Sequence, residues 1–344
     1  MLLIDYNDYP SCWLKGKPTN LLLILCASII IFFIFSPFFH FLFLRIICTV
    51  AVGVIGTTLA EGTLGNAGHC LFLGNSIQIK EAVDDNAISV INAEKAKLQK
   101  GLVVSLEKIG DADLARLCDA FPDIKGISIR GNKGLTSIAP LAKLTKLTSV
   151  DLSETVQVTD YSPLSSLTGL TELKVRSDGM SGDLAWMKPL VNLKKVEISS
   201  KKLTSFEGIP SLPQLKTAAF HNASPADLTP LVASLPNLTS LHLNYCVLSD
   251  LSPLAKLAHL DFLSLYGATV ADFSPLAQSP KLKRLNYYAV KSDNFASLGA
   301  LKQVSELDGG LTKLADISWI AELPNLKTFD VFAEHVTDYR PLTK

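Results

Sequence analysis

Apolar residues in this chain recur at a fixed interval of 22 or 23 residues, from Ile124 almost to the C-terminus. Each recurrence opens the phrase L-x-x-L-x-L, as in Leu238, Leu241 and Leu243. The first apolar positions of the successive units are Ile124, Leu147, Leu170, Leu193, Leu215, Leu238, Leu260, Leu282, Val304 and Leu326. A constant period of this length is typical of a solenoid, in which each unit buries its apolar side chains against its neighbours rather than within itself.

Within each unit, the L-x-L portion alternates with period two, so we expect a short strand whose leucines point inward and whose intervening residues point outward. A second recurrent phrase is S-P-L, preceded by an aspartate at Asp160, Asp250 and Asp272. An aspartate that accepts a backbone N–H shortly before a proline is a helix start signal. We therefore predict an α/β solenoid: a leucine-rich-repeat horseshoe of about ten 22–23-residue repeats, with a parallel concave sheet and short helical or 3₁₀ convex segments.

The period and the phrase D-x-S-P-L-x-x-L-x-x-L-x-x-L-x-L resemble the internalin-type leucine-rich repeats of bacterial surface proteins. The resemblance covers about residues 110–344, to which we assign the leucine-rich-repeat domain. It is highly specific for fold and only weakly specific for function. Members of that family are mostly non-enzymatic modules that bind proteins on the concave face, so the resemblance implies a protein partner bound there.

One position departs from that family's pattern. Three residues after the last strand leucine the family usually has an asparagine, and only Asn132 matches here. The same count places these residues in the later units: Thr155, Asp178, Lys201, Ala223, Cys246, Ala268, Val290, Thr312 and Glu334. We therefore expect no internal asparagine ladder, and we interpret Cys246 as a buried small residue.

The segment before the repeats is strongly apolar. Residues 21–44 contain no formally charged residue and are long enough to span a bilayer, whereas residues 46–60 are short for a second span. Lys15 and Lys17 precede them, and the positive-inside rule then keeps residues 1–20 in the cytoplasm. We predict a transmembrane signal anchor or signal peptide over residues 21–60, and a linker with an N-terminal cap over residues 61–109. A helix with Asp111 as its N-cap should close the N-terminal edge of the core.

Three topologies are compatible with the apolar segment. A signal anchor leaves the repeats extracytoplasmic, in the periplasm or at the cell surface, and attached to the membrane through residues 21–60. Cleavage near Ala60, after a small-x-small sequence, would instead yield a secreted protein. A two-helix hairpin hinged at residues 37–40 would return the repeats to the cytoplasm. We expect export.

Composition and motifs argue against several functions. The chain has 32 Lys and Arg against 32 Asp and Glu, so it lacks the basic field on which nucleic-acid binders depend. It contains no HExxH, no Gly-rich phosphate loop and no GxSxG elbow, and its histidines show no metal-ligand spacing. We therefore expect no enzyme activity, no nucleic-acid partner, no cofactor or metal and no small-molecule substrate.

The outward strand positions carry the candidate binding residues. They lie two, four, six and seven residues after each first apolar position, and they should form columns across a parallel sheet. From the fifth unit onward these columns become aromatic, and aromatic residues beside arginine are typical of an interface hot spot. The predicted partner-binding residues are His242, Tyr245, Phe262, Tyr266, Arg284, Asn286, Tyr288 and Phe332.

The sequence thus predicts an exported, membrane-anchored and non-enzymatic module that binds a protein partner on its concave face. The alternative is a cytoplasmic leucine-rich-repeat scaffold that regulates an enzyme.

Overall fold

A computed structural model describes residues 70–73, 76–95, 101–180, 182–310, 314–331 and 336–343, all of which fall in one compact unit, Asn66–Lys344. The predicted cytoplasmic segment 1–20 and the predicted membrane segment 21–60 lie outside the described residues. Among the helices that are described, none combines the length and the apolar character needed to cross a bilayer.

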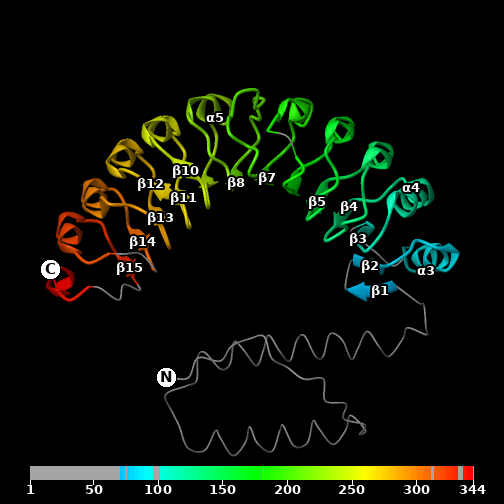
Figure 1. Cartoon of the computed structure of the whole chain (residues 1–344), viewed down its shortest axis with the longest axis horizontal. Coiled ribbons are helices and arrows are strands. Elements are labelled where there is room, and N and C mark those ends of the chain that lie inside the picture. Colours follow the sequence, from blue (N-terminus) through cyan, green and yellow to red (C-terminus); the bar gives the residue numbers. More distant parts are fainter. Residues whose placement is uncertain are drawn as a thin grey trace, which may run out of the picture. The chain divides into compact units, whose positions relative to one another are not determined.

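All but two of the described strands of this unit form one long sheet on the inner side of a curved stack (Figure 1). The order of the strands in the sheet follows the chain, and only β1 runs antiparallel to its neighbour in the described part. The strands of this sheet are β1 (Cys70–Leu73), β2 (Ser76–Lys80), β3 (Val103–Glu107), β4 (Gly126–Ile129), β5 (Ser149–Ser153), β6 (Glu172–Arg176), β7 (Lys195–Ser199), β8 (Thr217–His221), β9 (Ser240–His242), β11 (Phe262–Ser264), β13 (Arg284–Asn286), β14 (Glu306–Asp308) and β15 (Thr328–Asp330). A small parallel sheet pairs β10 (Val247–Leu248) with β12 (Thr269–Val270). The predicted parallel concave sheet is confirmed.

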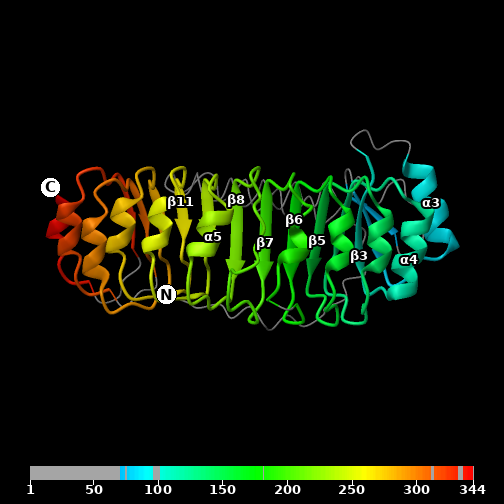
Figure 2. The ribbon, with the colours of Figure 1, turned by 90° about the horizontal axis from the view of Figure 1, so that it is seen from above.

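Short helical segments cover the outer side of the sheet, as the view from above shows (Figure 2). The 3₁₀ segments are η1 (Ala139–Lys143), η2 (Ser162–Ser166), η3 (Ala185–Met187), η4 (Ser252–Lys256), η5 (Ser274–Gln278), η6 (Phe295–Ala300), η7 (Ser318–Glu322) and η8 (Arg340–Thr343). The α-helices of the described residues are α3 (Asp85–Lys95), α4 (Asp111–Ala120) and α5 (Thr229–Ser234). This confirms the predicted convex segments.

The aspartates before these segments act as the sequence predicts. Asp160 accepts the backbone N–H of Ser162 at 2.9 Å, and Asp250 accepts that of Ser252 at 2.8 Å. Hydrogen bonds from the Ser162 side chain and backbone lower the pKa of Asp160. Each carboxylate therefore satisfies an N–H at the start of a helical turn, which has no partner within the turn itself.

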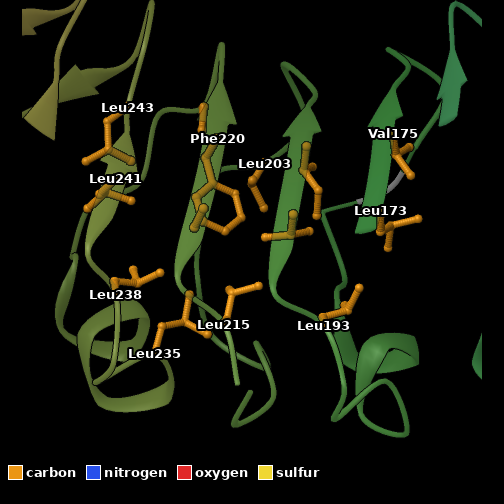
Figure 3. Packing of buried hydrophobic residues seen from close by; sticks show 14 of the residues in the cluster. Leu173, Val175, Leu193, Leu203, Leu215, Phe220, Leu235, Leu238, Leu241 and Leu243 are labelled. Atoms are coloured by element: carbon orange, nitrogen blue, oxygen red, sulfur yellow. The ribbon is translucent and has the colours of Figure 1, made fainter. Parts of the chain in front are cut away.

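The core is a continuous ladder of leucines between the sheet and the outer turns (Figure 3). Leu241, Leu263, Leu285 and Leu307 occupy the same register position on neighbouring strands, and each is at most 1% exposed. Burial of one such side chain contributes about 1.5–3 kcal/mol. Because each leucine is covered by the repeats on both sides of it, the stability of one repeat depends on the next.

The solenoid begins before the first repeat that the sequence pattern identifies. β2 pairs in parallel with β3, β3 pairs in parallel with β4, and α3 lies between β2 and β3 in the chain. Residues 61–109, assigned to a linker and cap, therefore contain strands that belong to the same sheet. Their apolar residues, such as Ile77 and Val104, are fully buried although they lack the leucine-rich phrase.

The helix expected at Asp111 is present as α4, but Asp111 is not its N-cap. The N-cap is Gly110, whose N–H donates to the Asp113 carboxylate at 3.1 Å. The Asp111 carboxylate accepts the backbone N–H of Thr136 at 2.8 Å and that of Ser137 at 3.1 Å, both in the following repeat. Moreover, α4 lies between β3 and β4 in the chain, so it does not close the N-terminal edge.

The turn that follows each strand has two forms. This corrects part of the assignment of residues to the turn position at which the family usually has an asparagine. In most described units a residue of positive φ follows the strand, and the residue after it is buried. The residues of positive φ at this position are Gly131, Glu154, Asn222, Tyr245, Gly267 and Ala289. In the units that begin at Leu170 and Leu193 no residue of positive φ intervenes, so the buried position comes one residue earlier, at Ser177 and Ser200. The assignment of Asp178 and Lys201 to this position was wrong, since both are exposed.

The buried turn residues satisfy the backbone in different ways. Asn132 accepts the N–H of Ile109 at 2.6 Å and donates to the carbonyl of Leu106 at 2.9 Å. Ser177 and Ser200 each donate to one carbonyl, at 3.2 and 3.1 Å. Cys246 is 1% exposed, as predicted, and burial raises the pKa of its thiol to about 12. The buried turn position is thus polar in the N-terminal repeats and small or apolar in the later repeats.

Asn132→Ala should lower the free energy of unfolding by about 1–3 kcal/mol, because it leaves the buried Ile109 N–H and Leu106 carbonyl without partners. Cys246→Ala is the matched control at the same repeat position, where the units on either side already carry alanine. Urea unfolding followed by circular dichroism should show the larger loss for Asn132→Ala. Equal losses in the two variants would contradict this account of the turn.

Candidate concave binding surface

The concave face consists of the outward positions of the parallel strands. Leu241, Leu263 and Leu285 point into the core, so the residues on either side of each leucine lie on the concave face. Of the predicted partner-binding residues, Tyr245 and Arg284 are exposed, whereas the half-buried ones are His242, Phe262, Tyr266, Asn286 and Tyr288. Phe332 lies outside the described residues. The structure therefore brings seven of the predicted residues to neighbouring repeats of one face.

Three tyrosines form a row across consecutive repeats. The Tyr245 and Tyr266 rings meet edge to face with centroids 5.1 Å apart, and the Tyr266 and Tyr288 rings stack at 5.4 Å with an interplanar angle of 5°. Such ring pairs favour each other by about 0.5–1.5 kcal/mol beyond the area they bury. The row is therefore an aromatic surface that contacts among its own rings keep ordered.

Glycines in the following repeats leave room for these rings. A Cβ atom at Gly267 would lie 2.6 Å from Cδ1 of Tyr245, and a Cβ atom at Gly310 would lie 2.4 Å from Cε2 of Tyr288. Each of these rings therefore lies directly over the backbone of the next repeat. Side chains at the two glycines would displace the rings from the face.

Tyr245 combines wide exposure with an unfavourable backbone. The residue is 53% exposed, and its φ of 58° lies in the left-handed region, where a bulky residue is uncommon. Gly131 and Gly267 occupy the equivalent position in two other repeats, and the smaller or more flexible Glu154, Asn222 and Ala289 occupy it in three more. Since glycine would fit this backbone better, the backbone conformation does not explain a bulky tyrosine at this position.

A second cluster lies beside the tyrosine row. The His242 and Phe262 rings meet edge to face at 5.2 Å, and the Arg284 guanidinium lies 5.1 Å from the centroid of Phe262. Arg284 also forms an ion pair of 2.7 Å with Asp261. A guanidinium held by both a carboxylate and an aromatic ring is oriented before any partner arrives.

Polar residues that the sequence analysis did not select support the aromatic ones. Asn244 accepts the Tyr266 backbone N–H at 3.2 Å and the Ser264 hydroxyl at 2.8 Å. Asn286 donates to Asp308 at 2.7 Å. Asn244 and Asp308 occupy outward positions six and four residues after the first apolar position of their units. The spacing of the outward positions therefore predicts both residues. The sequence analysis did not select them because it looked for aromatic residues and their neighbours.

Toward β7 and β8 the same face is charged and internally paired. Glu197 forms ion pairs with Arg176 and, at 3.4 Å, with Lys174, and His221 Nε2 lies 3.7 Å from its carboxylate. Burial opposes ionisation of Glu197, but these cations lower its pKa overall. Burial lowers the pKa of His221 and of His242 despite the charge of Glu197, so both imidazoles favour the neutral form. Within the described ranges, no group of three or more His, Cys, Asp or Glu is placed to hold a metal ion.

Comparisons with known proteins agree with the architecture. No family model matches the chain, and no curated protein matches it. Among solved structures, an internalin from Listeria monocytogenes, InlF, aligns with a TM-score of 0.56 at 25% identity, over 76% of this chain and 79% of that chain. Another internalin from that species, InlC2, aligns with a TM-score of 0.39 at 23% identity, over 58% of this chain and 83% of that chain. The similarity to InlF and the long parallel sheet confirm the predicted internalin-like leucine-rich-repeat fold.

Tyr245→Gly should raise the free energy of unfolding by up to about 1 kcal/mol, because the steric cost of a tyrosine at positive φ, about 1–2 kcal/mol, exceeds the roughly 0.5–1.5 kcal/mol lost with the Tyr266 ring contact. Glu154→Gly tests the backbone effect alone, since Glu154 occupies the same turn position with a φ of 63° in another repeat. Urea unfolding of both variants measures the change. A marked destabilisation by Tyr245→Gly, with none by Glu154→Gly, would show that the Tyr245 ring is part of the fold's own packing.

Proposed function

We propose that this internalin-like chain is a non-enzymatic protein-binding module, exported and membrane-anchored, whose partner contacts the concave face of β9, β11 and β13. The observation that carries the proposal is the exposed tyrosine on an unfavourable backbone, at one end of an ordered row of rings. A residue that costs the fold stability and is widely accessible is best explained by a contact outside the chain.

The composition of the face supports a protein partner. Tyrosine, phenylalanine and arginine are enriched at the centres of protein interfaces, where a few residues supply most of the binding energy. The rings are already fixed by stacking and the Arg284 guanidinium by its ion pair. Little side-chain entropy would therefore be lost on binding. The similarity to internalin InlF supports the same class of function, because a repeat solenoid offers an extended concave surface.

Export and anchoring rest on the amino-acid sequence of residues 21–60. Within it, residues 21–44 form an uncharged apolar stretch long enough to span a bilayer, and such a stretch preceded by Lys15 and Lys17 is typical of a signal anchor. The anchor would leave the repeats outside the cytoplasm and attached to the membrane.

Replacing Tyr245, Phe262, Tyr266 and Tyr288 together with alanine should weaken binding of proteins that copurify with the full chain by about 100-fold or more, since each hot-spot side chain contributes about 2 kcal/mol. The control is Val156→Ala with Val191→Ala, which removes exposed apolar surface outside the concave face. Quantitative mass spectrometry of the copurified proteins and urea unfolding should be run on both variants. Unchanged binding by a folded quadruple variant would refute concave-face recognition.

A tag at the C-terminus of the full chain should be digested by protease added to intact cells, while a cytoplasmic marker protein stays intact. The repeats would then be extracytoplasmic, and sequencing of the mature N-terminus would show whether the apolar segment is retained. Protection of the tag would contradict export and place the repeats in the cytoplasm.

A further inference from the structure

The charges of the concave face are balanced in the first half of the sheet. Asp151 on β5 is paired with Arg130, and Glu197 on β7 is paired with Lys174 and Arg176. Opposite charges on neighbouring strands stabilise a sheet. This part of the face therefore presents few charges that need an external partner.

The C-terminal end of the described sheet is different, because acidic residues face each other across it. Asp308 on β14 stands opposite Asp330 on β15, and Glu306 precedes Asp308 by two residues on the same face. Within the described part of the chain, no ion pair links a cation to any of these three carboxylates. Among the described residues, the Asp308 carboxylate accepts a hydrogen bond only from the neutral amide of Asn286. Burial and then repulsion by Asp330 raise the pKa of Asp308, so the free chain holds this carboxylate charge at a cost.

The arginine nearest in register does not neutralise this end of the face. Arg284 is paired with Glu306 in the sheet register, but its guanidinium is turned to Asp261 at 2.7 Å and to the ring of Phe262. We name the three acidic residues Glu306, Asp308 and Asp330 the acidic end of the concave face.

The acidic end adjoins the tyrosine row. The Tyr288 ring lies over Gly310, which follows Asp308 by two residues on the same face, about 7 Å along the strand. Tyr266 stacks on Tyr288 and fixes the orientation of that ring. An aromatic ring beside unpaired carboxylates attracts a cation by two mechanisms, Coulombic and cation–π.

We propose that the partner is a protein segment that carries an exposed arginine or lysine, which binds between Tyr288 and the acidic end while neighbouring residues of the segment contact the tyrosine row. The charge complementarity of the surface selects this occupant, because no cation among the described residues forms an ion pair with the acidic end. The inference rests on the proposed function, and it adds the chemistry of the partner and the place where its charge binds.

The probe is a short peptide of alternating arginine and serine, with glutamine–serine and glutamate–serine peptides of the same length as controls, titrated into the full chain by calorimetry. The arginine peptide should bind and the controls should not. The double variant Asp308→Asn with Asp330→Asn should weaken binding of the arginine peptide at least tenfold. It should also raise the urea midpoint of the free chain, because it removes the repulsion between the two carboxylates. Asp330→Lys places a cation of the chain opposite Asp308 and should weaken binding of the arginine peptide at least as much. The matched control Asp151→Asn, an acid of the same face that already has a partner, should change its affinity less than twofold.

Two results would overturn the inference: arginine-peptide binding that both variants of the acidic end leave unchanged, or equal binding of the glutamine peptide. Binding of the copurified partner to the two sets of variants distinguishes failure of this inference from failure of the proposed function. A partner that the quadruple aromatic variant loses, but that Asp308→Asn with Asp330→Asn retains, would refute the basic segment and leave the concave-face module standing. A partner that both variants retain would refute both proposals.

Discussion

Burial of the leucine ladder across repeat boundaries is the interaction on which the rest of this structure depends. Leu241, Leu263 and Leu285 lie at one register position on adjacent strands and are fully enclosed, but each is enclosed by its neighbours rather than by its own repeat. A repeat of 22 residues is too small to exclude water from its own leucines. The sheet, its fixed register and the columns on its concave face all follow from this nearest-neighbour packing.

The turns between strand and convex segment have to satisfy the backbone inside that ladder, and the chain does so in several ways. Asn132 satisfies two backbone groups of the preceding repeat, Ser177 and Ser200 satisfy one each, and later repeats place small or apolar residues there. A backbone of positive φ shifts the buried position by one residue, so two turn forms coexist in one solenoid. The family-typical asparagine is thus one solution among several to the same hydrogen-bonding requirement.

The concave face is organised by the same dependence between neighbours. The Tyr245 and Tyr288 rings occupy space that Gly267 and Gly310 of the next repeats leave open. Charges are paired on β5 and β7, whereas carboxylates oppose each other on β14 and β15. The ordered aromatic rings, the strained backbone of Tyr245 and the carboxylates without an ion pair among the described residues therefore all lie between β9 and β15. Strain and uncompensated charge raise the free energy of the chain, so a partner that relieves them gains affinity.

The period of the leucines by itself determined the fold class, the parallel sheet and the outward columns, because the requirement to bury one face of each strand leaves a single way to stack such units. The same rule placed seven of the predicted residues on one face. The extra strands β2 and β3 were missed, since their isoleucines and valines pack like leucines without the phrase that marks a repeat. Only the tertiary structure decided where Asp178 and Lys201 lie, which rings stack and which of the described carboxylates have no ion pair. Those outcomes depend on local φ values and on contacts between residues of different repeats, and no spacing within one repeat encodes them.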